Sequence, residues 1–120
     1  MRVLIADDRP RSRQGLRALL ATQPGIDVIG EAGDGHGILE LVETTRPDAV
    51  VMDAKMPAMD GLAATRAIKE RWPEIRVIVL TMYSTHRAEA MAAGADGFLV
   101  KGCSAERLLE AILERKEGRP

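Results

Sequence analysis

Aromatic residues and cysteine are scarce in this chain of 120 residues, which has one Trp, one Tyr, one Phe and one Cys. The single thiol, Cys103, excludes an internal disulfide framework and suits a reducing compartment, so we expect a cytoplasmic protein. No apolar stretch approaches the roughly 20 residues that a membrane helix needs. The N-terminus enters a strand-like segment without a secretory leader. The sequence therefore predicts no contact with a membrane.

A strong charge of either sign is also missing. Acidic and basic side chains nearly cancel to a formal net charge of -1, and the Lys and Arg residues are scattered. A chain without a basic face is not expected to bind nucleic acid itself, so DNA contact, if any, lies elsewhere. The length and the 46% hydrophobic content predict one compact domain over 1–120, in which the residues after about 115 are a candidate linker.

Short apolar runs alternate with longer segments of helical period. The runs predict five strands, at 3–6, 26–32, 49–52, 77–80 and 98–100. Five helices are expected between and after them, the first with Leu16, Leu19 and Leu20 on one face and the fourth over 85–93. This alternation favours a parallel sheet covered by helices on both faces.

The chemistry of the strands predicts their order. Three strands are continuous apolar runs, whereas the second is interrupted by Asp27 and Glu31 and the last is short, as suits the two edges of a sheet. The order 2-1-3-4-5 is the natural fit among doubly wound sheets. We therefore predict the flavodoxin-like (βα)5 fold, a three-layer sandwich.

Polar side chains follow four of the predicted strands. Asp7 and Asp8 follow the first strand, Asp53 the third, Thr81 the fourth and Lys101 the fifth. Each alone could be a helix cap, a turn residue or a solvated charge. Together they lie at the carboxyl ends of the strands, which is where open parallel sheets bind ligands. The sequence thus predicts one polar site at this edge.

Three carboxylates at one site repel each other, by on the order of 4 kcal/mol per pair at 4 Å. A divalent cation compensates for this repulsion, and Mg²⁺ prefers a few carboxylates with waters and phosphate oxygens. We therefore expect Asp7 and Asp8 to seat Mg²⁺, and Asp53 to attack a phosphorus atom as a nucleophile. The Lys101 ammonium and the Thr81 hydroxyl would complement the phosphoryl oxygens.

Four motifs carry a family resemblance: "VLIADDRP", "VVMDAKMPAMDGL", "VLTMYS" and "GADGFLVKGCSAERLLEAI". With them, the sequence resembles the receiver domain of bacterial two-component response regulators, and within it the NarL/FixJ (LuxR-type) subgroup. The resemblance implies a phosphorylation-dependent switch, not an enzyme in the ordinary sense, that promotes its own phosphorylation and dephosphorylation. It implies a sensor histidine kinase as partner and a helix-turn-helix DNA-binding domain as output.

The resemblance also implies roles for the acidic residues. Asp53 would be the phosphoacceptor, which takes its phosphoryl group from a phosphohistidine of the kinase. Asp8 and Asp53 would bind Mg²⁺ together with the backbone carbonyl of Ala54 or Lys55. Asp7 would bind the same ion through water.

Thr81 and Phe98 match the family's switch pair, in which the hydroxyl moves onto the phosphoryl group and the ring turns inward. Lys101 matches the family's lysine. The family commonly continues with proline after a cis bond, whereas this chain has Gly102, and a cis bond before a non-proline residue costs about 2.5 to 4 kcal/mol. The sequence leaves the geometry of this bond open.

Lys55 and Tyr83 stand two residues after Asp53 and Thr81. Both are long side chains placed where a hydrolytic water would approach, so we expect them to tune the lifetime of the phosphoryl group. The fourth helix is short and rich in Ala, which suits an element that shifts, and His86 near its start is expected to be exposed.

Helix 5 carries more apolar residues than one buried face requires, namely Leu108, Leu109, Ile112 and Leu113. This surplus predicts a dimer surface on the helix. The resemblance implies a homodimer through helix 1 and helix 5, or through the surface of helix 4, strand 5 and helix 5.

Three other classes of protein are alternatives for this sequence. An FMN-binding flavodoxin would need uncharged residues after the first strand and aromatics to sandwich the flavin. An aspartyl phosphatase would place its nucleophile on the first strand with a second Asp two residues later, and "DDR" lacks that spacing. A receiver-like module that acts by protein contact without phosphate stays open as the alternative.

Overall fold

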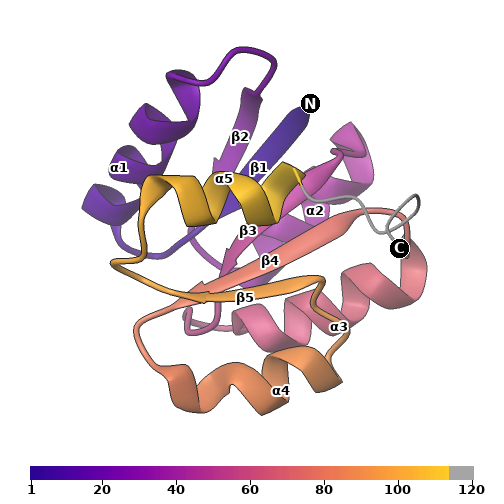
Figure 1. The fold of residues 1–120 in the computed structure, drawn as a ribbon. Helices are drawn as coiled ribbons and strands as arrows, with labels where there is room; N and C mark the ends of the chain where they lie inside the picture. Colours follow the sequence, from indigo (N-terminus) through magenta and orange to yellow (C-terminus); the bar gives the residue numbers. More distant parts are fainter. Residues whose placement is uncertain (114–120) are drawn as a thin grey trace, which may run out of the picture.

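The structure is a computed structural model that describes residues 1–113. Five parallel strands form one sheet with helices on both faces (Figure 1). The strands are β1 (Arg2–Ala6), β2 (Asp27–Ala32), β3 (Ala49–Asp53), β4 (Arg76–Thr81) and β5 (Gly97–Val100). The helices are α1 (Pro10–Ala21), α2 (Gly35–Thr45), α3 (Gly61–Arg71), α4 (Arg87–Ala92) and α5 (Ala105–Leu113), with a 3₁₀ turn, η1 (Ser84–His86), before α4. The candidate linker after about 115 lies outside the described residues.

The sheet order is β2-β1-β3-β4-β5, which confirms the predicted topology. The two strands with polar interruptions or short length, β2 and β5, are the two edges. The order reverses between β1 and β3, so the connections that leave these strands pass to opposite faces. The reversal opens a crevice at the carboxyl ends of β1 and β3.

Alternate residues of each strand enter two separate cores. On the face covered by α2, α3 and α4, Leu4 and Val50 are fully buried, and on the face covered by α1 and α5, Val3 and Val51 are fully buried. This separation follows from the period of two in a strand, and it explains why the central strands are apolar at every position. The two cores hold the sheet rigid beneath the polar ends of the strands.

Two helices differ from their predicted form. The helix expected over 85–93 is divided into η1 and α4, and Gly94 follows it with a φ of +97°. In α1, Leu20 is fully buried, whereas Leu16 and Leu19 are only partly buried. They are partly exposed because they line a hollow between α1 and the segment that leads into α5.

Replacing Gly15 with alanine is expected to stabilise the protein by about 0.5 to 1 kcal/mol. Gly15 lies inside α1, and a Cβ added there would meet no atom within 4 Å. The gain would come from the lower conformational entropy of the unfolded chain. Urea unfolding monitored by the fluorescence of the buried Trp72 measures it, and an unchanged or lower midpoint would contradict this explanation.

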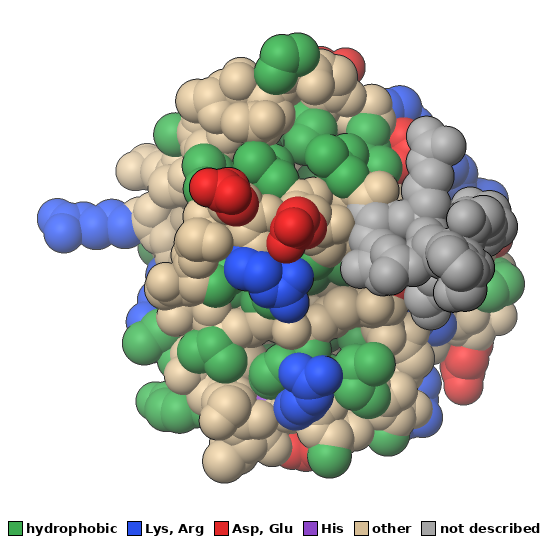
Figure 2. All heavy atoms as spheres, in the orientation of Figure 1, with side chains coloured by type: hydrophobic (Ala, Val, Ile, Leu, Met, Phe, Trp, Pro, Cys, Tyr) green, Lys and Arg blue, Asp and Glu red, His purple; other side chains and the backbone are tan. Residues whose placement is uncertain are grey.

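The visible surface carries charges of both signs. Over α5 and β5, acidic and basic side chains are interspersed with hydrophobic ones (Figure 2). Within residues 1–113, no helix has both the length and the apolar character required to cross a bilayer.

Candidate functional site

The carboxyl ends of the strands bring the predicted polar residues to one place. Asp7 follows β1, Asp53 and Thr81 are the last residues of β3 and β4, and Lys101 follows β5. The Lys101 amide donates to the Thr81 carbonyl at 2.7 Å, which extends the pairing of β4 and β5 by one residue. The parallel register therefore aligns these residues along one edge of the sheet.

Three carboxylates meet at this edge. Asp7, Asp8 and Asp53 each offer a carboxylate oxygen, and these oxygens all lie within 4.8 Å of one another. Asp7 and Asp53 are buried, whereas Asp8 is exposed. Oxygen donors at this separation fit a hard divalent cation, and Asp8 and Asp53 are the two of the three that line a cavity. This cluster could hold the metal.

Lys101 is the cation that faces the two buried carboxylates. Its Nζ lies 3.0 Å from Asp7 Oδ2 and 3.2 Å from Asp53 Oδ2, and its side chain is only 13% exposed. A single ammonium group thus pairs with two carboxylates in a partly dry environment. It offsets part of their mutual repulsion, and no other Lys or Arg of the described residues forms an ion pair with either of them.

The pKa values of the two buried carboxyls shift in opposite directions. Burial raises the pKa of Asp53, and the negative charge of Asp7 adds to this effect against the opposing effect of Lys101. Burial alone would also raise the pKa of Asp7, but hydrogen bonds from Ser12, the Arg9 amide and Lys101 lower it below its ordinary value. Asp7 therefore serves as a fixed negative charge, and Asp53 is the more basic carboxylate.

The loop after β1 fixes the orientation of Asp7. Its carboxylate accepts hydrogen bonds from the Arg9 amide at 2.9 Å and from the Ser12 hydroxyl. Arg13 donates to the Asp7 carbonyl at 2.7 Å and forms an ion pair with Glu31 at 3.1 Å. Sequence reasoning missed Ser12 and Arg13, because only the turn between β1 and α1 and the pairing of β1 with β2 bring these residues together.

Gly61 packs directly against the backbone of Asp53. A Cβ at Gly61 would lie 1.7 Å from the Asp53 carbonyl oxygen, so any side chain there would displace the phosphoacceptor candidate. The Gly61 amide donates to the Ala54 carbonyl at 2.9 Å, which closes the loop between β3 and α3. Asp60 caps the N-terminus of α3 by accepting a hydrogen bond from the Ala63 amide. The "DG" pair in the sequence is therefore the signal that marks Gly61 as the first residue of this helix.

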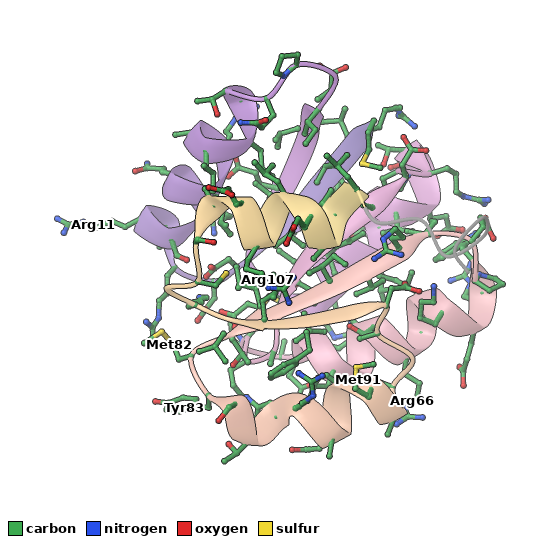
Figure 3. The ribbon with its side chains drawn as sticks, in the orientation of Figure 1. Arg11, Arg66, Met82, Tyr83, Met91 and Arg107 are labelled. Atoms are coloured by element: carbon green, nitrogen blue, oxygen red, sulfur yellow. The ribbon has the colours of Figure 1, made fainter. Side chains whose placement is uncertain are left out.

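A small cavity of about 110 Å³ opens above Asp53. Thr81 and Lys101 line it together with Asp8 and Asp53, and its other lining residues are Arg9, Lys55, Met82 and Tyr83. Met82 and Tyr83 are exposed and project outward from the segment between β4 and η1 (Figure 3). The Lys55 amide donates to Asp53 Oδ1 at 3.4 Å. The cavity is large enough for a small anion but not for a flavin.

The residues expected to form the switch lie near the start of α4. Thr81 is buried and its hydroxyl is hydrogen-bonded to His86 Nδ1 at 3.0 Å. The expectation that His86 is exposed was wrong, because η1 folds its ring back toward β4. Phe98 is buried against the core, with the guanidinium of Arg87 5.7 Å from the centre of its ring.

The Lys101–Gly102 peptide bond is trans. Gly102 has a φ of +96°, in the left-handed region that glycine adopts without a steric penalty. The chain thus makes its turn after Lys101 by a glycine conformation and not by a cis bond.

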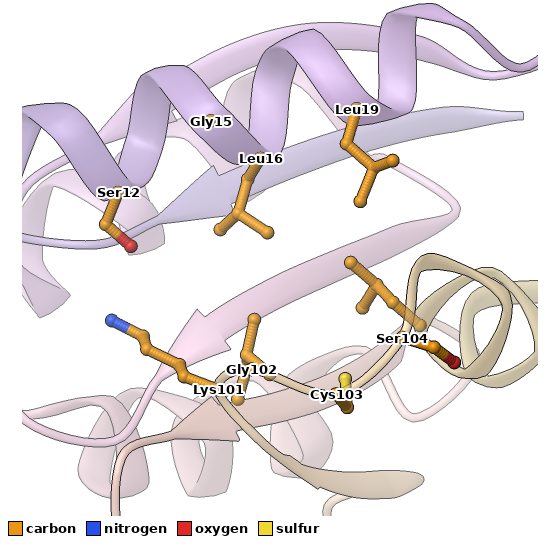
Figure 4. Close-up of a pocket in the computed structure, with 10 residues that line it drawn as sticks. Ser12, Gly15, Leu16, Leu19, Lys101, Gly102, Cys103 and Ser104 are labelled. Atoms are coloured by element: carbon orange, nitrogen blue, oxygen red, sulfur yellow. The ribbon is translucent and has the colours of Figure 1, made fainter.

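A second hollow of about 240 Å³ lies between α1 and the start of α5 (Figure 4). Leu16, Leu19 and Leu108 line its apolar part, and Ser12 and Lys101, which both bind Asp7, border it on the side of the carboxylates. This hollow, which also includes Cys103, is therefore adjacent to the acidic cluster but separate from the cavity above Asp53.

Comparison with known proteins assigns the chain to a family. Residues 3–113 match the family model of the response regulator receiver domain. The nitrate/nitrite response regulator protein NarL of Escherichia coli K12 is 35% identical over an alignment of 119 positions that covers 97% of this chain and 55% of NarL. The transcriptional activator DevR/DosR of Mycobacterium tuberculosis is 35% identical over an alignment of 121 positions that covers 99% of this chain and 56% of that protein. The chain spans about half the length of these curated relatives.

Solved structures of response regulators have the same fold as this chain. The receiver domain of the putative response regulator NarL of Mycobacterium tuberculosis has a TM-score of 0.89 and 32% identity, with 98% of this chain and 97% of that chain covered. A LuxR-family response regulator of Aurantimonas has a TM-score of 0.87 and 36% identity, with 92% and 81% covered.

A doubly wound sheet with three aspartates and one lysine at its reversal point is the architecture of a signalling receiver, and the chain belongs to the response regulator receiver domain family. Its relatives within that family are NarL/LuxR-type regulators.

Proposed function

We propose that this chain is a phosphorylation switch whose phosphoacceptor is Asp53. The observation that carries the proposal is the placement of the Asp53 carboxylate, buried at the base of the 110 Å³ cavity, 3.2 Å from the Lys101 ammonium and beside the exposed Asp8. This group is a carboxylate of raised pKa in a site that neutralises added negative charge. Both features favour attack on phosphorus.

The transfer forms one bond and breaks one. A carboxylate oxygen of Asp53 bonds to the phosphorus, and the bond from phosphorus to a histidine nitrogen of the sensor kinase breaks, so its electron pair leaves with the imidazole. Lys101 balances the negative charge that arrives on the phosphoryl oxygens, and the Thr81 hydroxyl donates to one of them. Phe98 then repacks with the Thr81 region and carries the change to the surface.

The donor set fits Mg²⁺. Asp8, Asp53 and the backbone carbonyl of Lys55 would hold the ion directly and Asp7 through water, a division supported by the full burial of Asp7 and its bonds to Arg9, Ser12 and Lys101. When bound, Mg²⁺ supplies positive charge to the phosphoryl oxygens.

Intact mass tests the proposal. Incubation with Mg²⁺ and acetyl phosphate is expected to add the mass of one phosphoryl group, and incubation with a chelator in place of Mg²⁺ is expected to add none. A folded protein that gains no mass at any donor concentration would contradict the proposal. It would favour the alternative of a module that binds its partner without phosphate.

The lifetime of the phosphoryl group is expected to depend on Lys55 and Tyr83. Both line the cavity and are exposed, so they stand in the path of a hydrolytic water. A Lys55→Ala, Tyr83→Ala double variant is expected to lose its phosphoryl group several-fold faster than the parent, as followed by intact mass after removal of the donor. Equal lifetimes would remove these two residues from the proposal.

The partners proposed are a sensor histidine kinase and a second copy of this chain, in the cytoplasm. The exposed Leu113 of α5 and the exposed Val100 of β5 support one or other of the two dimer surfaces, α1 with α5 or α4 with β5 and α5. A structure of RcsB, 26% identical, is bound to a promoter in the presence of the phosphomimetic BeF₃⁻. By analogy, a separate output domain would bind DNA for this chain. Sizing before and after phosphorylation tests the dimer.

A further inference from the structure

The Thr81 hydroxyl already has a partner before any phosphate arrives. Its Oγ1 lies 3.0 Å from His86 Nδ1, and it accepts a weaker hydrogen bond from the Tyr83 amide at 3.4 Å. Thr81 itself is 1% exposed and His86 is partly buried. Thr81 lines the cavity above Asp53, so its hydroxyl contacts His86 at the edge of the proposed phosphorylation site.

The arrangement indicates which atom carries the proton. The Tyr83 amide can only donate, so the hydroxyl oxygen is its acceptor. Among residues 1–113, the one other hydrogen-bond partner of Thr81 Oγ1 is His86 Nδ1. A buried hydroxyl that donates to nothing costs free energy, so we assign Thr81 as the donor and Nδ1 as the acceptor in this pair.

We infer that His86 is a positioning residue that competes with the phosphoryl group for the Thr81 hydroxyl. This inference rests on the proposed phosphorylation of Asp53. Thr81 has one proton to donate, so it cannot bind His86 Nδ1 and a phosphoryl oxygen at the same time. The bond to His86 stabilises the unphosphorylated arrangement, and the phosphoryl group must break it.

Breaking this bond releases the start of α4. His86 is the last residue of η1 and Arg87 the first of α4. His86 is hydrogen-bonded to Thr81, and the Arg87 guanidinium lies over the ring of Phe98, so these two consecutive residues contact both switch side chains. Within α4 only Ala90 is buried, and the helix has little other apolar attachment to the sheet. Loss of the contact between His86 and Thr81 therefore frees the segment whose movement carries the signal.

Beryllofluoride binding with Mg²⁺, followed by ¹⁹F NMR, measures the competition without hydrolysis. Phe in place of His86 keeps a ring beside Tyr83, whose own ring meets His86 edge-on at 5.7 Å, but removes Nδ1. We expect His86→Phe to bind beryllofluoride about 2- to 12-fold more tightly, the factor that corresponds to one net hydrogen bond. His86→Asn keeps a polar atom near Nδ1 and is expected to bind like the parent.

Two controls separate positioning from a general structural effect. His36→Phe changes the other histidine of the chain, which is exposed on α2, and is expected to leave affinity unchanged. In a Thr81→Val background, His86→Phe is expected to have no effect on affinity, because the hydroxyl for which the two groups compete is gone.

Equal or weaker binding by His86→Phe, or tighter binding that persists in the Thr81→Val background, would overturn the inference while the proposed function stood. A parent protein that fails to bind beryllofluoride at all would overturn both.

Discussion

Asparagine in place of Asp53 is expected to abolish the gain of one phosphoryl mass completely, because a neutral amide oxygen does not displace a leaving group from phosphorus under these conditions. The same variant is expected to be more stable than the parent at neutral pH without metal. Asp53 is held beside Asp7 in a buried site, and its raised pKa means that folding costs free energy when the group is ionised. Loss of activity together with gained stability distinguishes a functional carboxylate from a structural one.

The pH dependence of this stability difference follows from the sign of the shift. The pKa of Asp53 is raised above 3.8, so the folded state takes up a proton before the unfolded chain does. As pH falls from the raised pKa toward 3.8, the parent regains stability and its difference from Asp53→Asn shrinks. The effect of Asp7 on stability has the opposite sign, because its pKa is lowered in the folded state. Its ionised carboxylate stabilises the fold above pH 3.8, and this stabilisation is lost only as pH falls below 3.8.

Urea unfolding in a chelator, at neutral and at mildly acid pH, measures both effects. An Asp27→Asn variant is a matched control, because Asp27 is exposed at the start of β2, where it pairs with Arg2, whereas the acidic cluster follows the other end of β1. It is expected to match the parent in phosphorylation. Phosphorylation of Asp53→Asn to the parent's extent would assign the phosphoacceptor to another residue.

Methionine in place of Lys101 is expected to slow phosphoryl uptake by about 10² to 10³. The Nζ of Lys101 lies within 3.2 Å of both Asp7 and Asp53, and methionine retains the apolar stem without the charge. Because two buried carboxylates then face each other without a cation, the free energy of unfolding in a chelator is expected to fall by about 3 kcal/mol. Rates from intact mass and unfolding midpoints measure the two losses.

Two further variants test this explanation. Lys101→Arg retains the charge and is expected to keep more stability than Lys101→Met, although its planar fork does not reproduce the point charge between the carboxylates. Adding Asp53→Asn to Lys101→Met removes one of the two facing charges and is expected to restore part of the lost stability. If Lys101→Met were as stable as the parent and phosphorylated as fast, the ion pairs would have no role.

The sequence could distinguish the central strands from the edge strands. A strand buried on both faces is a continuous apolar run, whereas an edge strand is interrupted by polar residues or is short. The division of the fourth helix could not be predicted, since its few apolar residues carry little periodic signal. The position of the His86 ring could not be predicted either. Its ring is placed by the turn of η1, and a single polar residue has no pattern that reports such a turn.

The sequence alone determined the order of the strands and the set of residues at their ends, Asp7, Asp8, Asp53, Thr81 and Lys101. It could do so because strand period and burial are local properties of the chain. Only the tertiary structure decided which carboxylate is buried, which pKa rises, and that one lysine pairs with two aspartates 94 and 48 residues away. These depend on distances between segments remote in sequence, and charge interactions and desolvation are set by those distances and not by composition.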